Sequence, residues 1–293
     1  MRTLEYLLLD VFTRHPLEGN QLAVFLDARS LSTDEMQAIA RETNLAETTF
    51  ILPGEGTNGA YRVRIFTVDE ELPFAGHPTL GTAAALLSTN PGAREITLDL
   101  NAGKIPVRFE LRDALPFGEM RQLDPTFGQI HGPTTVARAA NLPPGSISTQ
   151  WPIQTVSTGM PFAIVPLTSL DVLRQLNLNW KQASEYLSTT DAKFLYFIAL
   201  DPDRENGNNI EARMIFYNGE DPATGSAAGC CIAWCVKHGV IAPDAIAVIH
   251  QGAMARRPSE IFVRASRDRN GSVNDVRVGG FSVLIGDGSL QLS

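Results

Sequence analysis

The sequence contains few cysteines and has no long apolar run. Its three cysteines, Cys230, Cys231 and Cys235, lie within one short apolar segment, where they could not join distant loops. Reduced core thiols in a reducing compartment are therefore expected. The apolar run beginning at Tyr6 is interrupted by Asp10, and no stretch approaches the roughly 20 apolar residues that cross a bilayer. With no targeting or anchoring signal either, we expect a cytoplasmic protein without a membrane partner.

Positive charge and metal-binding spacings are also lacking. The chain has 24 Lys and Arg against 32 Asp and Glu, a net charge of -8 that disfavours nucleic acid as a partner. Its 5 histidines are scattered without an H-x-H or H-E-x-x-H spacing, so no metal is expected. Segment 76–82 lacks the Lys of a phosphate-binding loop, and segment 225–229 lacks the G-x-S-x-G spacing of a serine hydrolase. We therefore expect neither a nucleotide cofactor nor a serine nucleophile.

An internal repeat is present in the 293 residues, a length that corresponds to about two domains. Segment 76–84, GHPTLGTAA, matches segment 220–228, EDPATGSAA, in a pattern x-Pro-x-x-Gly-[Ser/Thr]-Ala-Ala that pairs His77 with Asp221, an offset of 144 (221 − 77). The repeat predicts two copies of one structural half. We place the N-terminal lobe at 1–118 with closing strands at about 276–293, and the C-terminal lobe at 119–275.

Both halves are predicted to follow the order strand pair, helix, strands, small-residue helix, hairpin. The capping box Ser32-x-x-Glu35 opens an amphipathic helix whose counterpart starts near Ser169. Segment 113–133, rich in Pro and Gly, is predicted as the linker. Predicted strands are 7–12, 22–26, 48–52, 96–100 and 107–111 in the first half, and 153–156, 162–165, 194–200, 247–250 and 261–263 in the second.

The two small-residue helices carry the predicted binding site. Segments 79–87 and 223–236 are almost wholly apolar or small, which suits a helix enclosed by a curved sheet. Proline is favoured at the first helical position, so Pro78 and Pro222 predict N-caps at His77 and Asp221. If the two halves face each other, both helix N-termini would converge on one cleft and bind a carboxylate.

Three further residues at these helix starts are candidate ligands. Gly76 and Gly225 would let the backbone approach a small acid, and Ser226 would add a hydroxyl group. The alternative is that Asp221 and His77 only cap helices, which is more plausible for Asp than for His.

Glu47 is the candidate proton carrier. It lies in segment 44–50, NLAETTF, where a helix gives way to an apolar strand. A carboxylate among apolar neighbours is costly to bury without partners, and such a group can act as base and acid in turn. The alternative is a solvated turn residue. The offset of 144 leads from Glu47 to Asp191 (47 + 144), and the motif around Glu47 is not reproduced there.

Four segments together resemble the PhzF-like phenazine biosynthesis isomerases, which have the diaminopimelate epimerase-like fold. They are DVF with PLEGN at 10–20, NLAETTF at 44–50, ELPFAGHP at 71–78 and EDPATGSAAG at 220–229. The resemblance implies an α+β protein with two pseudo-symmetric lobes, each a curved sheet around a central helix, and a homodimer. It also implies a cofactor-free isomerase of a small carboxylate such as trans-2,3-dihydro-3-hydroxyanthranilate.

In this family a single glutamate moves the proton, and by resemblance this residue is Glu47, supported by His77, Asp221 and Ser226. Two other functions stay open at this point. A racemase or epimerase of a small acid would need two opposed bases, and the cysteine pair used in the wider fold is missing from both helix starts. A non-catalytic protein that only binds a small acid is the third hypothesis.

Overall fold

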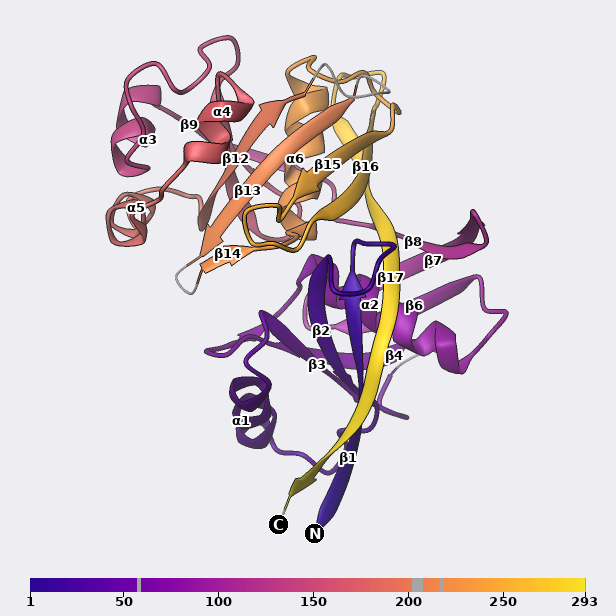
Figure 1. Ribbon diagram of the computed structural model, residues 1–293. Coiled ribbons are helices and arrows are strands. Elements are labelled where there is room, and N and C mark those ends of the chain that lie inside the picture. Colours follow the sequence, from indigo (N-terminus) through magenta and orange to yellow (C-terminus); the bar gives the residue numbers. More distant parts are fainter. Residues whose placement is uncertain (57–58, 202–207, 217–218, 293) are drawn as a thin grey trace. The chain divides into compact units, whose positions relative to one another are not determined.

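The computed structural model describes residues 1–56, 59–201, 208–216 and 219–292. The chain forms two compact units. Unit 1 comprises Met1–Arg121 and Gly279–Ser293, and unit 2 comprises Gln122–Val278. Figure 1 shows each unit as a strongly bent sheet with one helix against its inner face. Within the described residues, no helix is long and apolar enough to cross a membrane.

Unit 1 is a sheet that closes on itself. Strand β1 pairs with β2 on one side and with the last strand β17 on the other, and β17 also pairs with β8. Figure 1 shows β17 (yellow) beside β1 (indigo), as expected from the predicted return of the C-terminal tail. The elements of unit 1 are β1 (Arg2–Val11), β2 (Asn20–Phe25), α1 (Thr33–Thr43), β3 (Glu47–Leu52), β4 (Tyr61–Phe66), β5 (Glu71–Leu72), α2 (Gly76–Thr89), β6 (Glu95–Leu100), β7 (Gly103–Arg112), β8 (Leu115–Arg121) and the later part of β17 (Val273–Leu292).

Unit 2 repeats this connectivity. In both units two strand pairs are parallel, β2 with β3 and β4 with β6 in unit 1, and β11 with β12 and β13 with β15 in unit 2. Strands β6 and β7, β10 and β11, and β15 and β16 form antiparallel pairs of consecutive strands. The elements of unit 2 are β9 (Thr126–His131), α3 (Pro133–Ala139), β10 (Ile153–Ser157), β11 (Pro161–Pro166), α4 (Leu170–Gln175), α5 (Trp180–Leu187), β12 (Phe194–Leu200), β13 (Asn209–Phe216), β14 (Gly219–Asp221), α6 (Gly225–Lys237), β15 (Ala247–Gln251), β16 (Ser259–Arg267) and the first part of β17.

The central helices α2 and α6 are enclosed, as their composition predicts. Every residue of α6 except Lys237 is buried, and α2 contacts strands β1, β2, β3, β6, β7 and β8. The three cysteines are free and buried in α6. Small residues suit these positions because the surrounding sheet comes close to the helix. Gly81 of α2 is an example, since a Cβ there would lie 2.6 Å from Leu22 and 2.7 Å from Val11.

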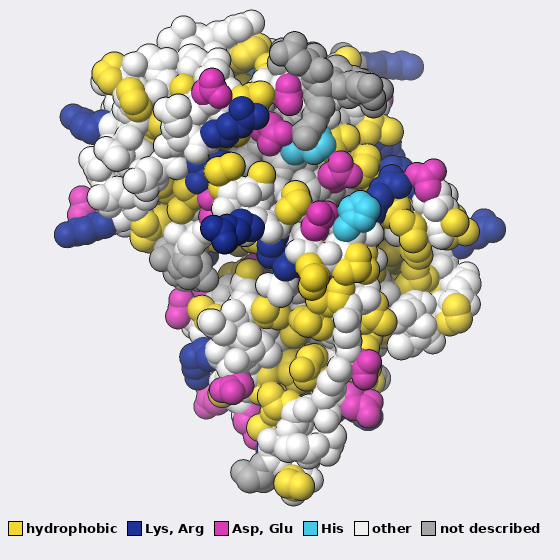
Figure 2. Space-filling model, in the orientation of Figure 1, with side chains coloured by type: hydrophobic (Ala, Val, Ile, Leu, Met, Phe, Trp, Pro, Cys, Tyr) yellow, Lys and Arg dark blue, Asp and Glu magenta, His cyan; other side chains and the backbone are white. Residues whose placement is uncertain are grey.

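The outer face of each sheet is covered by surface helices. In unit 1 the predicted capping box of Ser32 and Glu35 is present at the start of α1, which buries Met36, Ile39 and Ala40. In unit 2 the predicted helix at Ser169 is the short α4, and the sequence analysis missed α3 and α5. Apolar side chains remain exposed beside β17 in unit 1 (Figure 2), among them Leu284, which is 51% exposed.

The predicted linker at 113–133 contains the boundary between the two units, after Arg121, but it is not an irregular segment. It contains two regular strands, β8 and β9, which pair with β7 and β10. Phe117 and Met120 of β8 are buried in unit 1, so the alternation of apolar residues outweighs the turn-forming Pro and Gly. Pro116 lies within β8, opposite Leu111 of β7.

The register of the internal repeat also needs correction, from 144 to 149. Strands β4 and β5 pair Ile65 with Leu72, while β13 and β14 pair Met214 with Asp221. Both pairs differ by 149 (214 − 65 and 221 − 72), as do the helix starts at Gly76 and Gly225. The equivalent motif is therefore Glu-x-Pro-x-x-Gly, at 71–76 and 220–225, and the match of the small-residue runs at 144 does not reflect structural equivalence.

The N-cap residues of the two central helices differ from those predicted. The residues preceding α2 and α6 are Ala75 and Thr224, and neither side chain caps its helix. His77 lies inside the first turn of α2, and Asp221 ends strand β14 before the helix. The prediction that His77 and Asp221 are N-caps was therefore wrong, because Pro73 and Pro222, the equivalent prolines, lie in the turns before the helices.

Candidate active site

In unit 1 the structure brings Glu47 to the start of α2. Glu47 is the first residue of β3 and pairs with Leu22 of the parallel strand β2. Its Oε2 lies 3.5 Å from Nε2 of His77, and the two side chains are 13% and 4% exposed. The carboxylate is thus mostly shielded from water, at the end of a helix whose N-terminus favours negative charge.

His77 is neutral at ordinary pH. Burial lowers its pKa from 6.5 to about 3, and a backbone hydrogen bond with Gln21 opposes this shift only in part. The contact with Glu47 is therefore a polar contact between a neutral imidazole and a carboxylate, not an ion pair. Among the described residues, His77 Nε2 has no hydrogen-bond partner although it is buried. A buried ring nitrogen without a hydrogen-bond partner is unusual, and it marks a position where a ligand could supply the missing partner.

The other ring nitrogen of His77 has a protein partner. Nδ2 of Asn20 lies 3.1 Å from Nδ1 of His77, and both side chains are buried. Asn20 is the first residue of β2. The sequence analysis included Asn20 only as the last residue of the PLEGN segment, although a Gly-Asn pair directly before an apolar strand is a local signal for a polar side chain entering the sheet.

In unit 2 Asp221 is held by a small network of buried polar groups. Its Oδ2 accepts a hydrogen bond from the Thr224 hydroxyl at 2.6 Å, and its backbone carbonyl accepts one from Nε2 of Gln251 at 2.8 Å. Oε1 of Gln251 accepts from the Tyr196 hydroxyl at 2.9 Å. Burial raises the pKa of Tyr196 well above its usual value, so the phenol keeps its proton and orients the Gln251 amide.

A close approach of two backbone segments explains the glycine after Gln251. Gly252 has φ +83, and a Cβ there would lie 2.5 Å from the backbone oxygen of Pro222 and 2.2 Å from that of Arg257. Only glycine allows this geometry. Gln251, Thr224 and Tyr196 were missed by the sequence analysis, because their roles depend on pairing between β15 and the turn before α6.

The starts of α2 and α6 offer backbone donors. The first intrahelical hydrogen bonds run from Thr79 to Ala75 and from Ala228 to Thr224. The N–H groups of Gly76 and His77, and those of Gly225, Ser226 and Ala227, therefore have no acceptor within their helices. Such a helix start suits a carboxylate. Gly76, Gly225 and Ser226 are all buried.

Each helix start is preceded by the same bidentate ion pair. Arg64 binds Glu71 through Nε and Nη2 at 2.8 and 2.5 Å, and Arg213 binds Glu220 at 2.9 and 2.7 Å. The Arg64 guanidinium lowers the pKa of Glu71. Both pairs fix the short strand, β5 or β14, from which the chain turns into its helix. We interpret them as structural supports for the candidate residues.

The position equivalent to Glu47 in unit 2 is Phe194. Each residue begins its strand, and each pairs with a residue of the preceding parallel strand, Leu22 for Glu47 and Phe162 for Phe194. Phe194 packs against the rings of Phe162, Trp180 and Phe216. The residue suggested by the offset of 144, Asp191, instead accepts hydrogen bonds from Thr155 and from the backbone of Gln129. Unit 2 thus has an aromatic residue where unit 1 has a carboxylate.

The cysteines are not placed for acid–base chemistry. Cys230 and Cys231 lie beyond the first turn of α6, and burial raises the pKa of Cys230 to about 11. A thiol with this pKa is a poor base near neutral pH. Within the described residues, no group of three or more His, Cys, Asp or Glu side chains is arranged to hold a metal ion.

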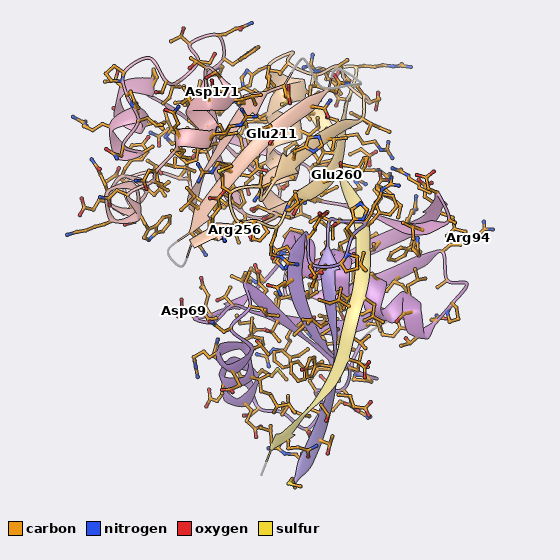
Figure 3. The ribbon with its side chains drawn as sticks, in the orientation of Figure 1. Asp69, Arg94, Asp171, Glu211, Arg256 and Glu260 are labelled. Atoms are coloured by element: carbon orange, nitrogen blue, oxygen red, sulfur yellow. The ribbon has the colours of Figure 1, made fainter. Side chains whose placement is uncertain are left out.

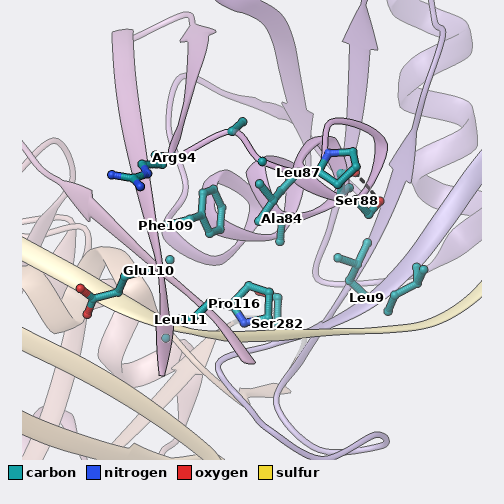
Figure 4. A pocket seen from close by; sticks show the side chains of 17 residues that line it. Leu9, Ala84, Leu87, Ser88, Arg94, Phe109, Glu110, Leu111, Pro116 and Ser282 are labelled. Carbon is teal, nitrogen blue, oxygen red and sulfur yellow. Dashed lines mark hydrogen bonds between the residues drawn. The ribbon is translucent and has the colours of Figure 1, made fainter. Parts of the chain in front are cut away.

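Unit 1 also has an apolar cavity of about 900 Å³ at the other end of α2. Figure 4 shows it between Ala84, Leu87 and Ser88 of the helix and the surrounding strands, with Phe109, Leu111 and Pro116 on the far side. Arg94 and Glu110 are at its rim, and Figure 3 shows Arg94 pointing outward from unit 1. Neither Glu47 nor His77 lines this cavity, so it is separate from the candidate active site.

Comparison with known proteins places the chain in a family. Residues 9–288 match the family model described as phenazine biosynthesis-like protein, PhzC-PhzF. The chain is 36% identical to an uncharacterized isomerase of Mesorhizobium japonicum, covering 99% of both chains. It is 34% identical to the trans-2,3-dihydro-3-hydroxyanthranilate isomerase of Pseudomonas chlororaphis, covering 98% of this chain and 99% of that protein.

A solved structure is similar over the same length. A predicted epimerase from Pseudomonas aeruginosa has a TM-score of 0.84 and 38% identity to this chain, covering 99% of this chain and all of the other. The predicted α+β, epimerase-like fold and the predicted family are therefore confirmed. The chain belongs to the phenazine biosynthesis-like (PhzC-PhzF) family and is an isomerase.

Proposed function

We propose that this isomerase moves a proton between two carbons of a small cyclic or conjugated carboxylic acid, with Glu47 as the single general acid and base. Trans-2,3-dihydro-3-hydroxyanthranilate, the substrate in the name of the Pseudomonas relative, is the model for this substrate class. The observation that carries the proposal is the shielded Glu47 carboxylate 3.5 Å from a buried, neutral His77.

Glu47 would act as base first and acid second. As a carboxylate it abstracts a C–H proton that the conjugated system of the substrate has made acidic, and the protonated carboxyl then returns the proton to another carbon. The neutral His77 suits this role because it can donate a hydrogen bond without adding a positive charge that would weaken the base.

The helix starts would bind the acid. We propose that the N–H groups at Gly76, Gly225 and Ser226, with the Ser226 hydroxyl, bind the substrate carboxylate, and that Asp221 orients its polar substituents. The network of Thr224, Gln251 and Tyr196 supports this role for Asp221, since it fixes the turn that carries this side chain.

A racemase or epimerase is the second candidate, favoured by the name of the Pseudomonas aeruginosa structure. Racemisation by two bases needs a second proton carrier. Phe194 at the position equivalent to Glu47, and the high pKa of Cys230, argue against one in unit 2. The one-base isomerase is therefore the better-supported function.

The test is turnover of trans-2,3-dihydro-3-hydroxyanthranilate in D₂O, followed by NMR. A shifted double-bond system with deuterium at the accepting carbon supports the proposal. Inversion at a carbon without a double-bond shift would indicate an epimerase. Binding of 3-hydroxyanthranilate in isothermal titration, with no turnover of the dihydro acid, would indicate a binding protein or a different substrate and would overturn this assignment.

We further propose that the enzyme works as a homodimer without a metal or another cofactor. The exposed apolar side chains beside the unit 1 cavity, Leu111 at 75% and Leu284 at 51% exposure, are typical of a surface that meets another chain. Sedimentation velocity tests the dimer, and a monomer at micromolar concentration would contradict it. Undiminished turnover after treatment with EDTA is expected, and loss of turnover would contradict metal independence.

A further inference from the structure

Asn20 is placed by a loop that leaves it little freedom. The loop between β1 and β2 contains Phe12 and Leu17 in the left-handed region, with φ of 65 and 71. Non-glycine residues adopt this conformation only when their surroundings hold them there, often near functional sites. Here the Leu17 N–H donates to Oδ2 of buried Asp10 at 2.6 Å, and the Phe12 N–H donates to the Phe281 carbonyl at 2.8 Å.

The end of the loop is equally constrained. Gly19 has φ +68, and a Cβ there would lie 2.4 Å from the backbone oxygen of Val11 and 2.7 Å from Thr13. Asn20 follows directly and pairs with Val11 in the β1–β2 ladder. The backbone on both sides of Asn20 is therefore fixed, and its buried side chain reaches Nδ1 of His77.

The chemistry of this contact determines the form of the imidazole. An amide nitrogen carries two N–H donors and cannot accept, so at 3.1 Å His77 Nδ1 must be the acceptor. A neutral imidazole carries its single proton on the other nitrogen, Nε2. We propose that Asn20 is a positioning residue that selects the Nε2–H tautomer of His77 and thereby aims a hydrogen-bond donor at Glu47.

This assignment explains the buried Nε2 that has no partner among the described residues. The proton on Nε2 points to the side on which Glu47 Oε2 lies 3.5 Å away. That separation is too long for a hydrogen bond in the free protein and short enough to close by a small side-chain movement when substrate displaces water. In the other tautomer a lone pair would face the carboxylate, and the two groups would repel.

A second neighbouring group also affects the ring. A backbone hydrogen bond with Gln21 raises the pKa of His77 against the larger opposing effect of burial, and it stabilises a ring N–H. The tautomer ratio measures how far the Asn20 contact places that proton on Nε2. The inference rests on the proposed function only for its catalytic consequence, because the tautomer itself is a property of the free protein.

The direct test is the ¹⁵N NMR spectrum of the histidine rings in the free wild-type protein, with His77 assigned by its loss in His77→Gln. We expect Nδ1 of His77 to have the shift of an unprotonated nitrogen and Nε2 that of a protonated one near pH 7. The reverse pattern would overturn the inference without bearing on Glu47 as the base.

Asn20→Asp gives the second test. An aspartate accepts from the ring, so we expect the proton to move to Nδ1, kcat to fall about 10²-fold and KM to change little. Asn90→Asp, at the exposed end of the same helix α2, adds the same charge and should leave both the spectrum and kcat unchanged. Asn20→Ser, which keeps a small donor, should restore part of kcat.

The outcomes separate this inference from the proposed function. Unchanged tautomer and kcat in Asn20→Asp would show that Asn20 does not position His77. If Glu47→Gln keeps wild-type turnover, the proposed function fails, whatever tautomer His77 has. Loss of turnover in Glu47→Gln together with a protonated Nδ1 in the wild type would retain the function and reject the role of Asn20.

Discussion

Units 1 and 2 have the same strand connectivity but differ at the position that begins the third strand. In unit 1 this position is Glu47, next to His77, and in unit 2 it is Phe194, packed among three aromatic rings. The bidentate Arg–Glu pairs before the two central helices are present in both units. The comparison teaches that the groups which shape the helix start are duplicated, whereas the candidate base is not.

Of the two equivalent residues Glu47 and Phe194, we expect substitution of Phe194 to have the larger effect on stability. Phe194→Ala truncates a residue that is only 6% exposed, and we expect a loss of about 3–5 kcal/mol in the free energy of unfolding. Glu47→Ala should change stability by less than about 1 kcal/mol while removing turnover. Urea denaturation of both variants measures the contrast, and equal losses of stability would break it.

The second prediction concerns the pH dependence that His77 gives to stability. Its pKa is lower in the folded protein than the ordinary 6.5, so the unfolded chain binds this proton first as the pH falls. The contribution of the neutral His77 to the free energy of unfolding is complete above pH 6.5 and is lost progressively toward pH 3. At pH 5 the loss is about 2 kcal/mol.

Unfolding of His77→Gln across this pH range measures the contribution, because the variant should lose less stability than the wild type between pH 6.5 and 5. His15→Gln, at an exposed position, serves as the control and should follow the wild type. Parallel curves for the wild type and His77→Gln would contradict a buried, neutral His77.

The smallest expected effect is at the start of α6. Ser226→Ala removes one hydroxyl but keeps the backbone N–H, so we expect kcat/KM to fall only about tenfold, the value of one hydrogen bond. Steady-state kinetics with the dihydro acid measures it. A loss as large as that of Glu47→Gln would indicate that Ser226 takes part in proton transfer, which would weaken the distinction between the two units.

Much of the fold could be predicted from the sequence. Apolar patterning predicted the strand at 194–200, and the capping box predicted the helix start at Ser32, because local sequence determines those elements. The register of the repeat could not be obtained this way. The small residues of the two enclosed helices match at 144, whereas strand pairing such as Ile65 with Leu72 sets the structural register at 149.

The candidate site divides in the same way. Glu47 and His77 could be proposed because a carboxylate and a histidine in apolar segments are conspicuous. Asn20, Thr224 and Gln251 could not be, since their partners are brought near by strand pairing and tight turns. The predicted linker contains the boundary between the units, but its two strands were missed, because Pro and Gly indicate turns only where the segment is not part of a sheet.

The measurement that tests the central claim most directly is turnover of Glu47→Gln with trans-2,3-dihydro-3-hydroxyanthranilate in D₂O, beside Glu42→Gln. Glu42 lies at an exposed position in α1, so its variant makes the same change of charge away from the candidate site. We expect Glu47→Gln to lose about 10³-fold or more in kcat and to incorporate no deuterium, while Glu42→Gln matches the wild type. Wild-type turnover and deuterium incorporation in Glu47→Gln would contradict the account.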